Sequence, residues 1–564
     1  MEEVRLTRRD AIVALMGTGA AAALASALAS CGRRDDRALP FEGAFVGTDD
    51  GLGHRLRTND LLARPAVRTE RVGTAILGGG VSGLSAAWAL ARADDTDFRV
   101  YELESAPGGT AISGACDVSR YPWGAHYVPV PAYPNPAMEA LLTEIGALTG
   151  RDEDGDPVFA EEMLCREPEE RLFHGFEWHP GLFPRLGASP RDLEQLARFE
   201  AAMAAFAAKR DAAGRRAFAV PTRRSSDDAE LLALDRMTMR DWMRAERFDS
   251  PRLLWFAEYG CRDDYAGSLD QISAWAGIHY YASRMAGNVE DEEPAPFLTW
   301  PEGNGRLVAH LARSAAGRIV PGALVFDVVP RTVTGAPVVV RYLDARTDEI
   351  VAVEARDAVL ALPKFVAAHL LSPWREKPSA FLKELSYAPW IVANLTLTGR
   401  PAERGAPLAW DNVLYDSKSL GYVVATHQTG LQTGRDYGPT VFTWYHSFAG
   451  EEAKAARERL FSMTWEEVAT AVMADLTRAH PDLPRLLTRL DVMRWGHAML
   501  RPGPGFLASG ARRLPDQPLG GVRFAHADTG LPLFEDAEDA GVRAAESILR
   551  ARGVPFRTLA GSGR

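Results

Sequence analysis

The chain has 564 residues, of which 46% are hydrophobic, and a net charge of −11. This size and composition predict two intertwined lobes with ample core, and the acidic balance argues against a nucleic-acid-binding protein. The four cysteines form no C-x-x-C pair and no zinc-ligand spacing. We therefore expect neither a fold dominated by disulfides nor a metal site.

Residues 1–31 have the features of a bacterial Tat-type lipoprotein signal peptide, which is excluded from the fold. Thr7-Arg8-Arg9-Asp10 carries a twin-arginine pair, an Ala-rich run follows, and Leu28-Ala29-Ser30-Cys31 is similar to a lipobox. We expect export by the Tat translocase and lipidation of Cys31, which would anchor the protein to a membrane on the periplasmic side of the envelope. The alternative is a transmembrane helix over the same run, which is about 20 residues long.

Residues 32–71 are polar and punctuated by Gly, Pro and Asp. This composition is typical of a linker, and we expect a tether here, although residues 41–45 could dock on the body.

A dinucleotide-binding turn is predicted after the first apolar strand. Gly78, Gly80 and Gly83 form G-x-G-x-x-G between that strand and an Ala-rich helix, and Glu102 follows at the end of a second strand. The glycines allow a tight turn, a close approach to a pyrophosphate and close helix packing, while the helix directs free N–H groups at the phosphates. Glu102 is placed to bind an adenosine ribose. The expected contact residues are Gly78, Gly80, Val81, Ser82, Gly83 and Glu102.

Gly108 and Gly109 follow Glu102 and complete an E-x5-G-G extension, from which point the chain resembles the flavin amine oxidase and phytoene desaturase superfamily. Further segments that resemble this superfamily are residues 124–128, 134–148, 300–307, 358–363 and 524–545. The sequence departs from the family pattern at Thr110, at His526-Ala527 and at Asp536.

The resemblance implies an α/β fold, with a Rossmann-like, glutathione-reductase-like FAD-binding domain and an inserted α+β substrate domain. The FAD-binding domain would comprise residues 72–135, 296–372 and 492–553, and the substrate domain residues 136–295 and 373–491. Strands are expected at Ala323–Val329, Val338–Tyr342, Ala358–Leu362 and Trp390–Leu397, and helices at Pro190–Ala213 and Trp465–His480.

The same resemblance assigns further cofactor contacts. Val325 would lie near the adenine, and Asp528 near the ribityl or pyrophosphate region. The helix that starts near Asp536 and Ala537 would direct its N-terminus at the flavin ring. No cysteine follows Cys261, which excludes a thioether near the C-terminus, so we expect non-covalent FAD, with a linkage through His as the open alternative. The remaining contacts expected from the resemblance are Gly108, Gly109 and Thr110.

Catalytic residues are harder to assign, because aromatic and His clusters are more often packing than chemistry. The candidates are His126, His369, Trp495 and His497. For an amine substrate, carboxylates at Asp263, Asp264 or Glu177 are possible partners.

The resemblance implies an exported FAD-dependent oxidoreductase that moves a hydride from a small-molecule substrate to flavin N5, with oxygen or a quinone-like carrier as the acceptor. Two alternatives remain open. One is a polyene or lipid desaturase or isomerase, and the other is a non-catalytic protein that only binds FAD.

Overall fold

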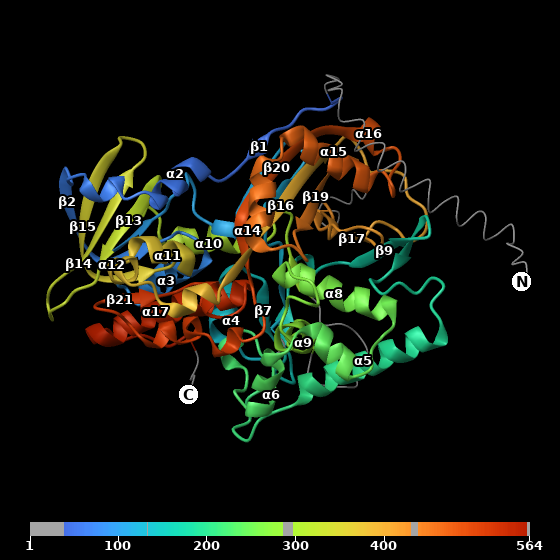
Figure 1. Ribbon diagram of the computed structural model, residues 1–564, viewed down its shortest axis with the longest axis horizontal. Coiled ribbons are helices and arrows are strands. Elements are labelled where there is room, and N and C mark those ends of the chain that lie inside the picture. The colour runs from blue at the N-terminus through green and yellow to red at the C-terminus, as the bar shows by residue number, and fades with distance from the viewer. Residues whose placement is uncertain (1–38, 132, 286–296, 430–437, 561–564) are drawn as a thin grey trace, which may run out of the picture. The chain divides into compact units, whose positions relative to one another are not determined.

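The computed structural model describes residues 39–131, 133–285, 297–429 and 438–560. The expected signal segment, Cys31 and the first part of the expected linker lie outside these residues. The body that begins at Glu42 contains two large sheets and the helices that cover them (Figure 1). Within the described ranges, no helix has the length and apolar character needed to cross a bilayer.

The first sheet, here called the cofactor sheet, has the strand order β12-β3-β2-β15-β14-β13. Its central strands β3, β2 and β15 run parallel, whereas β14 and β13 are antiparallel. The first half of β15 pairs with β14, and its last three residues pair with β21. The strands are β2 (Arg68–Leu77), β3 (Phe98–Tyr101), β12 (Ile319–Val320), β13 (Ala323–Val329), β14 (Val338–Asp344), β15 (Glu349–Leu360) and β21 (Val522–Phe524).

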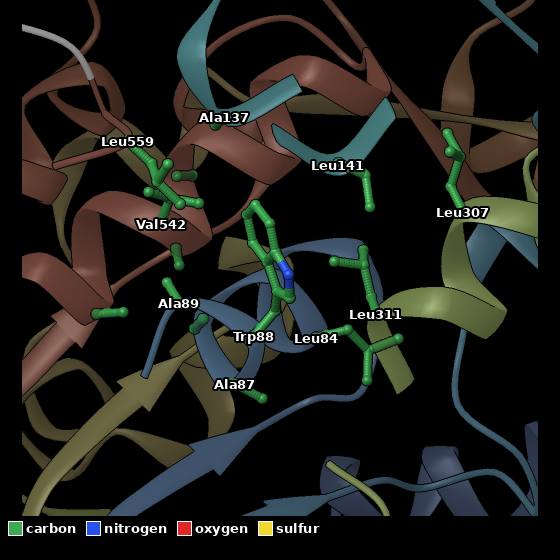
Figure 2. Packing of buried hydrophobic residues seen from close by; sticks show 14 of the residues in the cluster. Leu84, Ala87, Trp88, Ala89, Ala137, Leu141, Leu307, Leu311, Val542 and Leu559 are labelled. Atoms are coloured by element: carbon green, nitrogen blue, oxygen red, sulfur yellow. The ribbon is translucent and has the colours of Figure 1, made fainter. Parts of the chain in front are cut away.

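Helices α3 (Val81–Arg92), α10 (Gly305–Ser314) and α17 (Phe534–Arg552) pack together around Trp88. Figure 2 shows the Trp88 ring between Leu84, Leu311 and Val542. The Trp88 indole N–H is also satisfied, because it donates to Glu144 Oε2 at 2.9 Å.

The crossing of α3 and α17 requires glycine. A Cβ atom at Gly83 would lie 1.9 Å from Gly78 O, and one at Gly541 would lie 2.1 Å from Ser82 O. These contacts press the first turn of α3 against both the strand and α17, so that the backbone of the dinucleotide turn is fixed by packing.

The second sheet, here called the substrate sheet, has the order β1-β20-β16-β19-β18-β17-β9-β10. Helices α14 and α15 pack against β20 and α14 also against β16, while α5 to α9 build a separate helical cluster. The strands are β1 (Phe45–Val46), β9 (Glu170–His174), β10 (Glu177–Pro180), β16 (Ser386–Leu397), β17 (Asp411–Leu414), β18 (Gly421–Val424), β19 (Thr440–Ser447) and β20 (Leu487–Arg501).

Short hairpins and the remaining helices complete the described body. The short strands are β4 (Ser113–Ala115), β5 (Arg120–Pro122), β6 (Tyr127–Pro129), β7 (Leu148–Arg151), β8 (Pro157–Phe159) and β11 (Phe297–Thr299). The helices are α2 (Asp50–His54), α4 (Pro136–Glu144), α5 (Pro190–Ala208), α6 (Ala229–Ala233), α7 (Met239–Ala245), α8 (Pro251–Tyr265), α9 (Ala274–Ala282), α11 (Lys364–Leu370), α12 (Ser372–Glu376), α14 (Ala453–Ser462), α15 (Trp465–Leu476) and α16 (Leu483–Leu486).

Residues 42–66, which the composition places in a linker, are packed onto the body. Strand β1 pairs with β20 of the substrate sheet. Farther along, Leu61 is buried against Leu324 and Phe326 of the cofactor sheet, and Arg341 donates to the Leu62 carbonyl at 3.2 Å. The segment therefore crosses from one sheet to the other, and we call it the N-terminal strap.

Several element boundaries differ from the sequence expectation. Strand β20 belongs to the substrate sheet, so residues 492–501 do not join the cofactor sheet. Strand β2 begins at Arg68, and β16 begins at Ser386, four residues before the predicted start. The two predicted helices end earlier, at Ala208 and Leu476. Ends of helices are set by caps and tertiary contacts that periodicity does not report.

Candidate functional site

A cavity of about 670 Å³ lies where β2 and β15 end, between the cofactor sheet and the substrate sheet. Its walls come from the dinucleotide turn, from the segment after β15, from β16, β19 and β20, from the strap and from the start of α17. The carboxyl ends of parallel strands at a switch in strand order are the usual ligand site of such folds.

The dinucleotide turn presents an open helix N-terminus to this cavity. Gly78 has φ +102°, and a Cβ there would lie 2.5 Å from Ala361 O. Gly80 precedes α3 without a side-chain cap, and a Cβ at Gly80 would come no closer than 3.9 Å to a neighbouring atom. The buried Ser82 hydroxyl lines the cavity and has no hydrogen-bond partner. Free N–H groups and an unpaired hydroxyl fit a pyrophosphate.

Glu102 and the Gly108-Gly109 pair form the next part of the wall. Glu102 Oε2 accepts from Gly79 N at 2.7 Å and Oε1 from Glu104 N at 2.9 Å, while burial raises the pKa of its carboxyl. Gly108 N donates to Gly79 O at 2.8 Å, so the two glycine loops hold each other. Glu102 remains on the cavity wall, where a ribose hydroxyl can reach it.

The predicted cofactor residues separate into two groups. Those on the cavity wall are Gly78, Gly80, Val81, Ser82, Glu102, Gly108, Gly109, Thr110, Asp528 and Ala537. Gly83, Val325 and Asp536 do not line it. Gly83 serves the packing of α3 described above, and Val325 is buried in the core between β13 and α11.

Asp536 requires a correction, because its carboxylate has a structural partner. Both oxygens accept from Thr222, whose hydroxyl lies 2.8 Å from Oδ2 and whose N–H lies 3.1 Å from Oδ1. The interaction ties the first turn of α17 to the helical cluster, 314 residues away in sequence. Its neighbours Leu533, Glu535 and Ala537 line the cavity, whereas Asp536 does not.

Asp528 lies on the cavity wall, but its carboxylate is occupied by protein groups. It accepts from Lys364 Nζ at 2.8 Å, from Lys364 N at 2.7 Å and from the Tyr387 hydroxyl at 2.7 Å, and His526 Nδ1 lies 3.1 Å away. Burial alone would raise the pKa of this carboxyl, but His526 and Lys364 outweigh burial and hold the pKa well below its usual range. Asp528 is therefore a charged anchor for the segment after β15.

The four predicted catalytic candidates all line the cavity. His126 contacts Tyr445 at 4.8 Å and Trp410 at 5.3 Å between ring centroids, and burial lowers its pKa to about 4. The imidazole is therefore neutral at physiological pH. Trp495 donates its indole N–H to Trp123 O at 2.6 Å, which fixes it as a wall of the cavity.

His497 and His369 lie in a different part of the cavity wall. His497 stacks on Phe365 at 4.1 Å, and burial together with Arg457, Arg57 and His54 lowers its pKa to about 3. Burial also lowers the pKa of His369, with Arg57 of the strap adding to the effect. Among the described residues, the charged groups that act on these two rings are cationic, so both pKa values are shifted toward the neutral imidazole.

Carboxyl groups form one end of the cavity. Asp264 accepts from Arg284 at 2.6 Å, whereas Asp263 has only a long hydrogen bond from Tyr280, at 3.3 Å. Burial and the neighbouring Asp264 raise the pKa of Asp263 to about 7. Glu177, the third predicted acid, lies on β10 and takes no part in this wall.

Several wall residues were not predicted from the sequence. They are Tyr387 beside Asp528, Trp390 on the substrate sheet, Arg284 and Glu535 at the acidic end, and Thr48, Asp49, Asp50, Gly53, His54, Leu56 and Arg57 of the strap. Lys364 pairs with Asp528 but does not itself line the cavity. Trp390 carried a signal, since it begins a predicted strand, and its indole N–H is buried without a partner.

Solved structures with this fold share little sequence with the chain. A double mutant of putrescine oxidase matches with a TM-score of 0.61 and 18% identity, over 86% of this chain and 100% of its own. Cyclohexylamine oxidase from Brevibacterium oxydans IH-35A matches with a TM-score of 0.58 and 16% identity, over 87% and 100%. A CLA-producing fatty acid isomerase from P. acnes matches with 0.56 and 12%, over 85% and 98%.

These likenesses confirm the expected fold class. No curated protein matches the chain. A model of the flavin-containing amine oxidoreductase family matches residues 81–549, which is well over half of the sequence. The dinucleotide turn, the Gly108-Gly109 loop and the uncapped start of α17 line one cavity, and their chemistry fits a flavin dinucleotide. The chain therefore belongs to the flavin-containing amine oxidoreductase family and is an FAD-dependent oxidoreductase.

Proposed function

We propose that the protein oxidises an amine, with the C–H bond next to the nitrogen as the hydride donor. The observation that carries this proposal is the acidic end of the cavity. Asp263 lines the cavity and forms no ion pair within 4 Å in the described part of the chain, because Arg284 is paired with Asp264. An ammonium group is the partner that such a carboxyl lacks, and its arrival would favour the ionised form of Asp263.

Aromatic side chains support the same assignment. Tyr445, Trp390 and Trp495 project from the substrate sheet into the cavity, and Tyr127 and His126 lie beside them. Aromatic faces attract cations and exclude water, so they suit an amine with an alkyl or aryl body.

Different residues of the cavity wall would bind the cofactor and the substrate. When FAD is bound, it supplies the hydride acceptor. The turn at Gly80 and Ser82 holds the phosphates, Glu102 holds the adenosine ribose, and the flavin binds without a covalent link. Asp263 orients the amine, and the aromatic wall restricts its motion so that the reacting C–H bond keeps one orientation.

Anaerobic titration of the purified protein tests this proposal. Monoamines and diamines of increasing chain length are expected to bleach the flavin absorbance, and air should restore it with peroxide release if oxygen is the acceptor. Asp263→Asn should raise the KM for the best amine about 100-fold while the flavin content stays at wild-type level, because hydrogen bonds to charged groups contribute about 1.5–3 kcal/mol. Failure of every amine to bleach the flavin refutes the proposal.

A lipid desaturase or isomerase is the second candidate, which the fold shared with the fatty acid isomerase favours. The acidic end argues against it, because a fatty-acid carboxylate would face Asp263 and find Arg284 already paired. Bleaching by an unsaturated lipid but not by amines would reverse this choice. Bleaching by any substrate excludes a purely structural flavin.

We also propose that the protein works on the periplasmic side of the envelope, exported by the Tat translocase and anchored through Cys31. The support is the twin-arginine pair with the lipobox-like Leu28-Ala29-Ser30-Cys31. A folded-state route also suits a protein whose cofactor is loaded before export. A quinone-like carrier in the membrane would then compete with oxygen as acceptor. Cys31→Ser should move the protein from the membrane fraction to the soluble fraction, and an unchanged distribution contradicts the anchor.

A further inference from the structure

Glu535 separates the main cavity from a second, smaller hollow. It is the second residue of α17, and it lines both spaces together with Arg284. The hollow has a volume of about 20 Å³, which is enough for one water molecule. Its other walls include the half-buried residues Pro131 and Tyr133, so it lies between Glu535 and the protein surface.

Polar groups in the hollow are available to water. The buried Asn135 Oδ1 lines it and has no hydrogen-bond partner in the protein. A water in the hollow would therefore have the Asn135 amide and the Glu535 carboxyl among the groups that line its site. Ordered waters of this kind make two to four hydrogen bonds to such groups.

The groups around Glu535 have opposing effects on the pKa of its carboxyl. Arg284 faces it from the end of α9, Asp264 faces it from α8, and the neutral hydroxyls of Tyr127 and Tyr133 are close by. Burial raises the pKa of Glu535 to about 7, and Arg284 lowers it. A carboxyl of this kind can both accept and release a proton near neutral pH.

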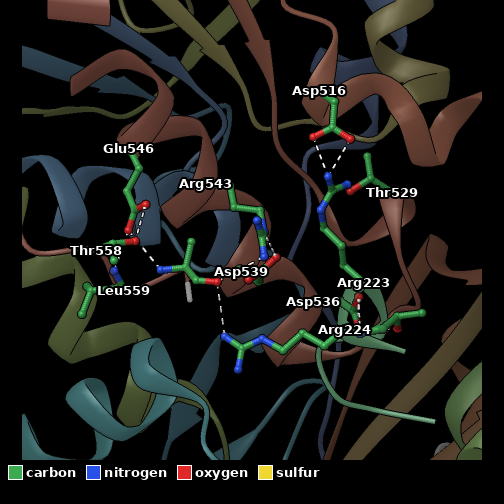
Figure 3. Close-up of polar contacts among 12 residues, drawn as sticks. Arg223, Arg224, Asp516, Thr529, Asp536, Asp539, Arg543, Glu546, Thr558 and Leu559 are labelled. Atoms are coloured by element: carbon green, nitrogen blue, oxygen red, sulfur yellow. Dashed lines mark hydrogen bonds and ion pairs between the residues drawn. The ribbon is translucent and has the colours of Figure 1, made fainter. Parts of the chain in front are cut away.

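Other acids on the same helix differ from Glu535 in their contacts. Figure 3 shows Asp539 beside Arg543, at 2.6 Å, and Glu546 accepting from the N–H of Leu559 at 2.6 Å. Glu546 also accepts from Arg550 at 2.6 Å. These two carboxylates have fixed structural roles. Glu535 has neither an ion pair within 4 Å nor a side-chain donor among the described contacts, and it alone of these acids faces the cavity.

We propose that Glu535 takes the proton that an ammonium substrate must lose and releases it through the small hollow. This inference rests on the proposed amine oxidation. An ammonium nitrogen has no lone pair to assist the departure of hydride, so one N–H bond must break first. The proton forms an O–H bond on the Glu535 carboxylate, which gives a neutral amine and a carboxylic acid without any change in electron count. Water in the hollow then carries the proton outward.

The pH dependence of flavin reduction tests the proposal, with Glu535→Gln as the variant and Glu538→Gln as its matched control. Glu538 lies one turn later on α17 and is fully buried, but it lines neither space. Glu535→Gln should slow flavin reduction about 100- to 10,000-fold near neutral pH, the range typical of a lost general base. The loss should shrink as pH rises and free amine accumulates. Glu538→Gln should keep the wild-type profile.

Two further measurements make the test independent of turnover. A pH indicator in weakly buffered solution should report proton release on anaerobic amine binding in the wild type and in Glu538→Gln, but not in Glu535→Gln. Infrared difference spectra should lose carboxyl intensity that titrates near neutral pH in Glu535→Gln relative to the wild type, while Asp263 and Asp536, whose pKa values are also raised to about 7, keep their contribution in both. If that variant does not fold, Glu535→Asp should retain the titrating band with slower reduction.

The outcomes separate this inference from the proposed function. If no amine reduces the wild-type flavin, the proposed function fails and the role of Glu535 fails with it. If amines reduce the wild-type flavin but Glu535→Gln keeps the wild-type pH profile, or matches Glu538→Gln, only the role of Glu535 is overturned.

Discussion

Replacement of Lys364 by Met should show how strongly the buried pair with Asp528 supports the fold. Both side chains are fully buried, and Nζ lies 2.8 Å from Oδ1. Loss of the ammonium breaks a buried ion pair, which typically costs about 3–5 kcal/mol, and leaves His526, 3.1 Å away, as the remaining group that lowers the pKa of Asp528. The Tyr387 hydroxyl and the backbone N–H of residue 364 still donate at 2.7 Å, so we expect the lower end, about 3 kcal/mol.

Urea unfolding of the flavin-free protein measures this loss. The double variant Lys364→Met with Asp528→Asn should recover most of it, because a neutral amide needs no counter-charge, and the double-mutant cycle should give a coupling of about 2 kcal/mol or more. Lys454→Met is the control, since its pair with Glu458 is exposed and 3.9 Å long; exposed pairs contribute about 0.5 kcal/mol. A Lys364→Met variant no less stable than this control would show that the buried pair is not ionic.

Three further changes test other parts of the site. Ser82→Ala should leave the flavin-free protein as stable as wild type but weaken FAD binding about 10-fold, measured by fluorescence titration, because the unpaired hydroxyl gains its partner only from the phosphates. Gly541→Ala should lower the Tm and reduce flavin content together, since the new Cβ would lie 2.1 Å from Ser82 O, where helix α3 cannot yield without moving the dinucleotide turn. Glu535→Gln should stabilise the flavin-free protein by up to about 3 kcal/mol at pH 8 and not at pH 4. The pKa of Glu535 is raised to about 7 in the folded state, so the wild type loses stability as the pH rises from the unfolded-state pKa through the folded-state pKa. Equal effects at both pH values would contradict this linkage.

The parts of the site that the sequence predicts are those whose chemistry is local. Gly80, Ser82 and Glu102 lie within one βαβ unit, and each residue type is required by the turn, the helix start or the strand end that carries it. Their places on the cavity wall follow from this unit alone.

The parts that could not be predicted depend on contacts between distant segments. Asp528 was expected to face the cofactor and does lie on the cavity wall, but its pairing with Lys364 spans 164 residues. The partner of Asp536 is Thr222, on the other lobe. No periodicity or spacing in a single sequence reports such pairings, so a motif departure such as Asp536 cannot be told apart from a cofactor contact.

The strap shows a different limit. Its polar and turn-forming residues predict a linker. Without apolar side chains, residues 42–66 would have no apolar contacts to hold them on the body. The contacts with the cofactor sheet come from four leucines, which an average over the composition of the segment does not reveal: Leu52, Leu56, Leu61 and Leu62. A short segment is packed by a few well-spaced leucines, whatever its mean polarity.

Both proposals depend on how the charged groups at the acidic end of the cavity are paired. Arg284 pairs with Asp264 at 2.6 Å and so leaves Asp263 to bind an ammonium and Glu535 to take its proton. Had Arg284 paired with Asp263 instead, Asp264 would be left as the carboxyl without an ion pair on this wall. The N-terminus of α17 adds positive potential at Glu535, which favours its ionised form before substrate arrives, while desolvation favours the neutral form afterwards. Amine binding is thus assigned to Asp263 and amine deprotonation to Glu535, and the pairing of Arg284 with Asp264 leaves both carboxyls available for these roles.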